Sequence, residues 1–116
     1  MPVYFAMGYF VRPGKVTEYK QWLNSDEARR LTGQIEKECG LKYLGTYWTI
    51  LGLGDYDCED WWVAPDWAAL DKSRESKAGD EMLLKQYGFI DQTRSGKTRV
   101  FRTSEDVNVI EPPPKQ

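Results

Sequence analysis

The stretch Gly52-Leu53-Gly54-Asp55-Tyr56-Asp57-Cys58-Glu59-Asp60-Trp61-Trp62-Val63 decides the fold of this chain. Two glycines and an aspartate are typical of a turn, and the aromatic residues that follow favour a strand. Residues 41–51, which come before the turn, have the same strand-like composition and include Tyr43, Tyr47 and Trp48. The sequence therefore predicts a β-hairpin that turns at residues 52–55 and continues as a strand at residues 56–64.

On the N-terminal side of the hairpin, residues 3–11 predict a strand with apolar side chains on both faces. From residue 15 the apolar spacing becomes helical and ends at Cys39-Gly40, where glycine is a typical helix stop. Asn24 and Glu27 form an N-cap-like pair. This segment is therefore expected to be helical, either as one helix or as two pieces.

On the C-terminal side, Pro65-Asp66 is expected to end the hairpin strand and to cap a further helix. Trp67, Leu70 and Arg74 are expected to face inward from that helix. We expect Gly79-Asp80 to interrupt it, with Asp80 capping a last short helix. That last helix would carry Met82, Leu83 and Tyr87.

Residues 97–103 predict a final strand, so residues 1–104 form one domain and the proline-rich residues 105–116 form an extended tail. The order strand, helix, strand, strand, helix, strand is typical of an α+β ferredoxin-like fold, βαββαβ, with an antiparallel sheet and helices on one face. The other sheet face then needs cover. The apolar residues on both faces of the first strand favour a second copy of the chain as that cover.

The composition excludes several classes of protein. The chain has 116 residues with 16 basic and 18 acidic side chains and no histidine. Histidine-dependent nucleophiles, histidine-ligated zinc and histidine-ligated haem are therefore excluded. No basic face favours nucleic acid and no apolar run is long enough for a membrane span, so we expect a cytoplasmic protein with neither partner. The two cysteines, Cys39 and Cys58, suit reduced thiols.

Three short motifs resemble those of a known group. They are Phe10-Val11-Arg12-Pro13-Gly14-Lys15, Gly54-Asp55-Tyr56-Asp57 and Val63-Ala64-Pro65-Asp66. The chain resembles the dimeric α+β barrel superfamily, in particular its antibiotic-biosynthesis-monooxygenase-like and glycine-tyrosine-aspartate-turn branches. The resemblance covers residues 3–103 in element order and implies a homodimer in which two sheets face each other.

The same resemblance implies several activities, because the superfamily contains cofactor-independent monooxygenases, muconolactone-isomerase-like enzymes, haem-degrading proteins and stress-responsive proteins. The haem branches that use histidine conflict with this sequence. No cofactor is expected.

Asp60 is the preferred catalytic residue. Strand alternation places Cys58, Asp60 and Trp62 on one face, and the resemblance implies that this face looks toward the helices, where ligand cavities of related folds lie. A carboxyl buried there would have a raised pKa, as a general acid or base requires. The alternative is a structural carboxylate paired with Arg99, Arg102 or Lys42. The other acidic residues near the turn are scattered over two faces, so no metal site is expected.

Aromatic side chains are the candidate ligand-binding residues, because aromatic walls stack on flat rings. The alternative for each is a place in the core or in the dimer interface. The candidates are Tyr9, Tyr47, Trp48, Trp62, Trp67 and Tyr87.

Two functions follow as hypotheses. The first is a dimeric enzyme, a cofactor-independent monooxygenase or isomerase acting on a flat aromatic or polyketide-like substrate. The second is a non-catalytic dimeric module that binds a small hydrophobic ligand or acts in a stress response. A cavity that contains Asp60 without a salt bridge would favour the enzyme, and a filled core with Asp60 paired would favour the module.

Overall fold

A computed structural model describes residues 2–94 and 96–102 of the chain. The expected tail at residues 105–116 lies outside the described residues. The elements in chain order are β1 (Val3–Tyr9), α1 (Val16–Leu23), α2 (Asp26–Cys39), β2 (Lys42–Trp48), β3 (Cys58–Ala64), α3 (Trp67–Lys72), the 3-10 helix η1 (Ser73–Glu75), α4 (Lys77–Gln86) and β4 (Thr98–Arg102).

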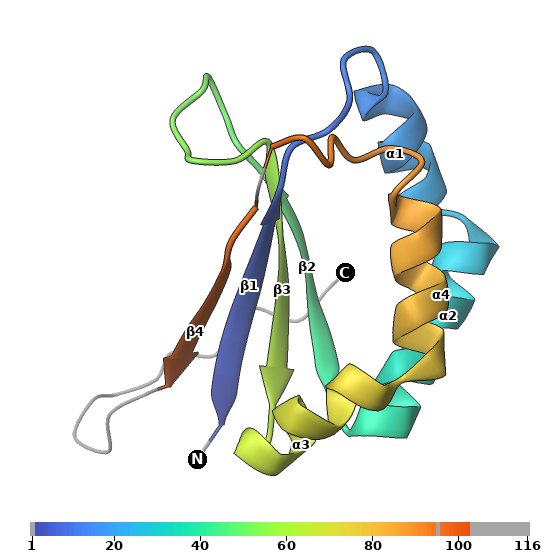
Figure 1. Ribbon diagram of the computed structural model, residues 1–116, viewed down its shortest axis with the longest axis vertical. Helices are drawn as coiled ribbons and strands as arrows, with labels where there is room; N and C mark the ends of the chain where they lie inside the picture. The colour runs from blue at the N-terminus through green and yellow to red at the C-terminus, as the bar shows by residue number, and fades with distance from the viewer. Residues whose placement is uncertain (1, 95, 103–116) are drawn as a thin grey trace.

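The strands of the described residues form one antiparallel sheet in the order β2-β3-β1-β4. Helices α1, α2 and α4 lie on the same side of this sheet (Figure 1). This arrangement confirms the α+β ferredoxin-like fold, including the hairpin of β2 and β3, that the sequence predicts.

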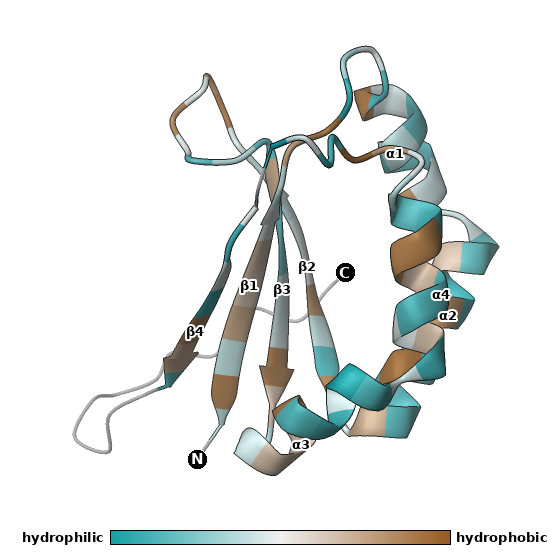
Figure 2. Ribbon diagram, in the orientation of Figure 1, coloured by the Kyte–Doolittle hydropathy of each residue, from teal (hydrophilic) through white to brown (hydrophobic). Residues whose placement is uncertain are grey.

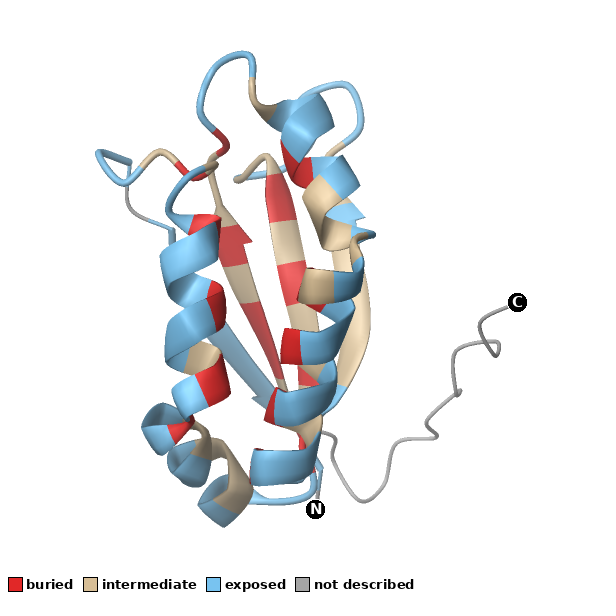
Figure 3. Ribbon diagram, turned by 90° about the vertical axis from the view of Figure 1, so that its right-hand side faces the viewer, coloured by how far each residue is buried: buried red, intermediate tan, exposed pale blue. Residues whose placement is uncertain are grey.

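The main core lies between the sheet and the helices. Val3 and Phe5 of β1 and Trp62 of β3 are buried against Leu31 and Ile35 of α2. The strands behind the helices carry buried residues (Figure 3), and along β3 these alternate strictly with half-buried ones. This period of two fixes which face of β3 is inside, and hence the side on which Asp60 lies.

The hairpin strands are shorter than the sequence predicts, because residues 49–57 form a loop. Thr49 N–H donates to the Asp57 carbonyl at 3.0 Å and closes this loop. Asp57 N–H then donates to the Tyr9 carbonyl at 3.0 Å, and its Oδ2 accepts from Val11 N–H at 2.8 Å. Asp57 therefore binds the end of β1 and the residues just after it through its N–H and its carboxylate, and β3 begins at the next residue.

Gly8 allows the hairpin to pack closely on β1. A Cβ atom at this position would lie 2.3 Å from the Tyr56 ring, far inside van der Waals contact. The aromatic ring of the Gly54-Asp55-Tyr56-Asp57 motif thus lies over a strand position where only glycine fits.

The first helical segment consists of two helices, and the predicted N-cap at Asn24 is wrong by one residue. Ser25 is the N-cap of α2, and its Oγ accepts from Ala28 N–H at 3.2 Å. The Asn24 amide instead donates to the Lys20 carbonyl at the end of α1. Glu27 accepts a hydrogen bond from the Trp22 indole at 2.9 Å, so it links α1 to α2 and has no capping role.

The predicted interruption at Gly79-Asp80 is also wrong. Helix α4 begins at Lys77, and its N-cap Ser76 accepts from Gly79 N–H at 3.0 Å. The Ser76 hydroxyl donates to Glu38 of α2 at 2.7 Å, which fixes this cap against the neighbouring helix. The prediction that Trp67 faces inward is wrong as well, because this side chain, on the first residue of α3, is 59% exposed.

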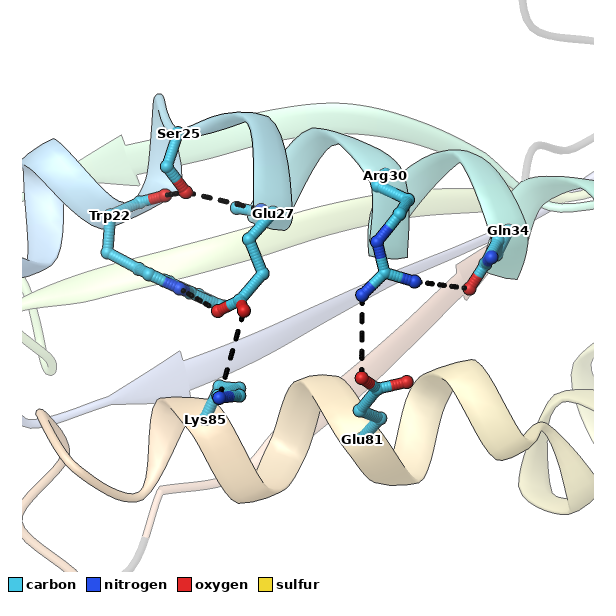
Figure 4. Close-up of polar contacts among 8 residues, drawn as sticks. Trp22, Ser25, Glu27, Arg30, Gln34, Glu81 and Lys85 are labelled. Carbon is cyan, nitrogen blue, oxygen red and sulfur yellow. Dashed lines mark hydrogen bonds and ion pairs between the residues drawn. The ribbon is translucent and has the colours of Figure 1, made fainter.

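Helices α2 and α4 are joined on their outer side by polar contacts (Figure 4). Glu27 pairs with Lys85 at 3.7 Å, and Arg30 pairs with Glu81 at 3.4 Å. These exposed pairs contribute little to stability. The opposite side of α4 carries its buried residues Ala78, Met82 and Gln86, and the burial of Ala78 and Met82 in the core keeps this side toward the sheet.

No helix of the described residues lies over the other sheet face. Trp61 of β3 stacks on Phe101 of β4 with ring centroids 5.7 Å apart, and Tyr47 of β2 meets Trp61 edge-on at 6.5 Å. Hydrophobic residues occur on β4 as well as on β1 and β3 (Figure 2). At one edge of the sheet, β2 has a register shift between Tyr43 and Gly45, where Gly45 has φ +140°.

Candidate functional site

Asp60 lies in the interior of the molecule, on the face of β3 that is covered by the helices, and is 4% exposed. Thr46, its cross-strand partner on β2, donates a hydrogen bond from Oγ1 to Asp60 Oδ1 at 2.6 Å. Gln86, in the last turn of α4, donates from Nε2 to Oδ2 at 3.3 Å. The carboxyl is therefore held by neutral donors from two elements.

These bonds belong to a longer chain of polar groups. The Gln86 amide also donates to the Tyr19 hydroxyl at 2.9 Å, and the Tyr43 hydroxyl is hydrogen-bonded to Thr46 Oγ1. Because the single proton of the Thr46 hydroxyl goes to Asp60, Tyr43 is the donor to Thr46. The chain Tyr43, Thr46, Asp60, Gln86, Tyr19 therefore points hydrogen-bond donors at the carboxyl from both sides.

Burial raises the pKa of Asp60 from its ordinary 3.8 to about 6, although the bonds from Thr46 and Gln86 act in the opposite direction. Among the described residues, no Lys or Arg forms an ion pair with Asp60. Arg99, one of the expected partners, pairs with Glu59 on the opposite sheet face. The carboxyl can thus gain or lose a proton near neutral pH.

The phenols around Asp60 are kept protonated. Burial, with a further effect from the Asp60 charge, raises the pKa of Tyr9 and Tyr19 well above the ordinary value. Burial raises the pKa of Tyr43 to about 12 and that of the Cys58 thiol to about 12. Cys58 is therefore a neutral buried thiol and not a nucleophile.

A cavity of about 220 Å³ lies beside Asp60, between the sheet and the helices. Trp62 is in its wall, is 4% exposed, and its indole Nε1 has no hydrogen-bond partner among the described residues. Apart from these groups the wall is mainly apolar. Its apolar and aromatic residues are Phe5, Met7, Tyr9, Leu23, Ile35, Leu41, Tyr43, Met82 and Leu83. The remaining lining residues are Ser73, Arg74, Gly79, Asp80 and Gln86.

The cavity brings together three of the residues that the sequence singles out, Asp60, Tyr9 and Trp62. The others lie elsewhere. Tyr47 is 55% exposed on the open sheet face, and Trp48 packs against Tyr19 with ring centroids 6.0 Å apart. Both also border a wider, open groove along the edge strand β2. Trp67 and Tyr87 are exposed and do not line the cavity.

Sequence reasoning missed Gln86, Thr46, Tyr43 and Tyr19. One signal was present for Gln86, which follows Ala78 and Met82 at intervals of four residues and so falls on the buried stripe of its helix. A polar residue on such a stripe needs a buried partner. To predict that Thr46 lies opposite Asp60, one needs the pairing register of β2 and β3. The loop at residues 49–57 prevents this register from being counted from a tight turn.

No family model and no curated protein matches the chain. Solved structures do match over most of its length. A NIPSNAP family protein from Agrobacterium tumefaciens strain C58 has a TM-score of 0.67 at 16% identity and covers 91% of this chain and 96% of that chain. An uncharacterized NIPSNAP-like domain protein from Burkholderia xenovorans has a TM-score of 0.67 at 12% identity, with 96% and 92% covered.

A conserved protein from Methanosarcina mazei Go1 has a TM-score of 0.64 at 19% identity and covers 90% of this chain and 94% of that chain. The likeness is one of fold. It agrees with the ferredoxin-like α+β fold, while the monooxygenase-like and glycine-tyrosine-aspartate-turn branches named from the motifs stay predictions.

Two further observations concern the described part of the chain. None of its helices is long and apolar enough to cross a membrane. Within residues 2–94 and 96–102, no group of three or more Cys, Asp or Glu side chains is arranged to hold a metal ion.

The raised pKa of Asp60 predicts how stability changes with pH. The folded state binds the Asp60 proton more tightly than the unfolded state, so the stabilisation is present below pH 4 and is lost as pH rises through about 6. Each pKa unit corresponds to about 1.4 kcal/mol, so the loss is about 3 kcal/mol. Relative to wild type, Asp60→Asn should gain about this much unfolding free energy between pH 4 and pH 7 in urea titrations.

Asp71→Asn is the control, because Asp71 lies exposed on α3. This variant should follow the pH profile of the wild type. An Asp60→Asn profile parallel to wild type would contradict the assignment.

Proposed function

We propose that this protein binds a small, mostly apolar, ring-sized molecule in the cavity beside Asp60. The observation that carries the proposal is a mainly apolar cavity whose wall includes Asp60 and Trp62, a buried carboxyl and a buried indole, for which the described residues offer no cation and no N–H acceptor respectively. Small-molecule sites have this composition, with apolar walls and a few convergent polar groups.

The volume supports a ligand of modest size. A dry apolar cavity of about 150 Å³ accepts benzene. The cavity beside Asp60, at about 220 Å³, has room for one aromatic ring with a few substituents. A multi-ring polyketide would not fit without movement of the helices.

The apolar open face of the sheet supports a homodimer as the binding form. The stacked pair Trp61 and Phe101 and the half-exposed Tyr47 form an aromatic row on this face. Beside the row, Glu59 and Arg99 neutralise each other. Such a face is apolar and balanced in charge, which suits a second copy of itself.

The β2–β3 loop adds to this surface. Its aliphatic residues Ile50, Leu51 and Leu53 are 73% to 89% exposed. Figure 1 shows the loop reaching away from the helices, on the side of the open sheet face. We infer that a partner chain covers these side chains together with the aromatic row.

Proton transfer is a second candidate function. The observation that favours it is the burial of Asp60 in the cavity wall with no ion-pair partner among the described residues, which raises the pKa of this carboxyl to about 6. A carboxyl of this kind can remove a proton next to a carbonyl, the first step that an isomerase or a cofactor-independent monooxygenase needs. Binding comes first in either case, so the ligand-binding proposal is the broader one.

A blocked cavity tests the binding proposal. Leu83→Trp adds bulk at the cavity wall, whereas Leu84→Trp adds it at the next residue, which is 70% exposed and outside the wall. In wild type and Leu84→Trp, ethylbenzene or 4-ethylphenol at about ten times Kd should add about 1.4 kcal/mol of stability. The expected rise in melting temperature is roughly 4–6 °C by calorimetry.

Leu83→Trp should lose most of this rise. An equal rise in both variants would place the binding outside the cavity, and no rise in wild type would exclude ring-sized ligands of this kind.

Size-exclusion chromatography with light scattering tests the dimer. Wild type should elute at about twice the chain mass of 13.5 kDa. Phe101→Glu, which puts a charge in the aromatic row, should shift the protein toward the monomer, and Leu84→Glu on the outside of α4 should not. A wild-type monomer at micromolar concentration would rule out the dimer.

Deuterium exchange tests proton transfer. In D₂O, the methyl protons next to the carbonyl of acetophenone should exchange faster with wild type than with Asp60→Asn, followed by NMR. A loss of about 100-fold is the scale expected when a general base is removed. Equal exchange in both proteins would leave Asp60 without a catalytic role, and Asp71→Asn is again the control.

A further inference from the structure

Trp62 is held with its indole in one place. Its ring stacks on Phe5 with 6.4 Å between centroids and an interplanar angle of 5°, and it packs on Tyr43 at 5.0 Å. The Nε1–H is buried and has no acceptor among the described residues. A buried donor without a partner is unfavourable, so this site favours a ligand that brings an acceptor.

Asp60 can accept a hydrogen bond from a ligand, whereas Trp62 can donate one. Each of its oxygens already accepts one hydrogen bond, from Thr46 or from Gln86, and an ionised carboxylate has further acceptor sites. A ligand hydroxyl can donate to those sites. Asp60 and Trp62 lie on the same face of β3 two residues apart, which separates their Cα atoms by about 6.6 Å. Both side chains therefore leave the strand on the covered side, where both belong to the cavity wall.

The charges around the cavity select against anions. Arg74 is the cation of the cavity wall among the described residues, and its side chain is largely exposed and pairs with Asp71 at 3.5 Å. Asp80, also in the wall, adds negative charge. A carboxylate or phosphate beside Asp60 would therefore meet a like charge with no buried cation to offset it.

We propose that Trp62 and Asp60 select a neutral, single-ring phenol with an acceptor oxygen at the opposite end of the ring, such as a para-hydroxyphenyl ketone. This inference rests on the proposed binding function. Trp62 Nε1 donates to the carbonyl oxygen, and the phenol hydroxyl donates to Asp60. The ring lies between the apolar side chains of β1 and α4.

A series of single-ring compounds tests the proposal on wild type by calorimetry. 4-Hydroxyacetophenone carries both groups, acetophenone only the acceptor, 4-ethylphenol only the hydroxyl, and ethylbenzene neither. One hydrogen bond corresponds to about five- to ten-fold in Kd. The affinity should therefore rise by about that factor for each group added, and 4-hydroxybenzoate, an anion, should bind more weakly than 4-ethylphenol.

A spectroscopic readout follows the indole directly. The chain has five Trp residues, and Trp62→Phe identifies which indole signal in a ¹H–¹⁵N spectrum belongs to Trp62. Its proton should move downfield with 4-hydroxyacetophenone and acetophenone, but not with 4-ethylphenol. If Trp62→Phe does not fold, assignment of the labelled wild type by through-bond and through-space spectra serves instead.

The outcomes separate the two proposals. Ethylbenzene binding as tightly as 4-hydroxyacetophenone, or an indole signal that responds alike to the ketone and to 4-ethylphenol, would overturn the selection by Trp62 and Asp60 and leave the binding site standing. Failure of every compound, ethylbenzene included, to bind would overturn both.

Discussion

The candidate site is organised around the Asp60 carboxyl, which is buried and has no ion-pair partner in the described part of the chain. Its only described hydrogen-bonding partners are neutral, the hydroxyl of Thr46 and the amide of Gln86. Two neutral donors do not offset the loss of hydration, so the pKa rises to about 6. The unfavourable free energy of burying this charge is partly offset by hydrogen bonds. Strands β2 and β3 and helix α4 each contribute a residue to one hydrogen-bonded chain, which joins the sheet to the helix layer.

Because Gln86 is part of this hydrogen-bonded chain, the orientation of helix α4 affects the site. Gln86 reaches Asp60 only because α4 is rotated with Ala78, Met82 and Gln86 toward the sheet. Further contacts join α4 to α2: the buried cap Ser76 donates to Glu38, and two ion pairs lie on the outer side. The exposed ion pairs are weak, so the burial of Ala78 and Met82 in the core is the main interaction that brings the Gln86 amide to Asp60.

The sequence predicts the fold well because its strongest patterns are local. The alternation in β3 correctly places Asp60 and Trp62 on one face, which the resemblance implied to be the covered one, and the Asp66 cap of α3 is where it is expected. Errors arise where neighbouring residues can make the same interaction. Asn24 and Ser25 are both good caps, and only the backbone of Ser25 is extended. Gly79 resembles a break, although a glycine in the first helical turn does not end a helix.

The candidate site is less predictable, because it depends on contacts between elements far apart in the sequence. Gln86 and Tyr19 are 67 residues apart and meet through one hydrogen bond. Single aromatic residues carry no sign of whether they face a cavity, as Trp67 shows by its exposure.

Gly45 affects how the edge of the sheet can associate with other strands. Its irregular backbone breaks the regular ladder of the outermost strand β2, which makes that edge a poor template for another strand. The irregularity at Gly45 therefore hinders the addition of strands along β2 and with it growth into open-ended fibres.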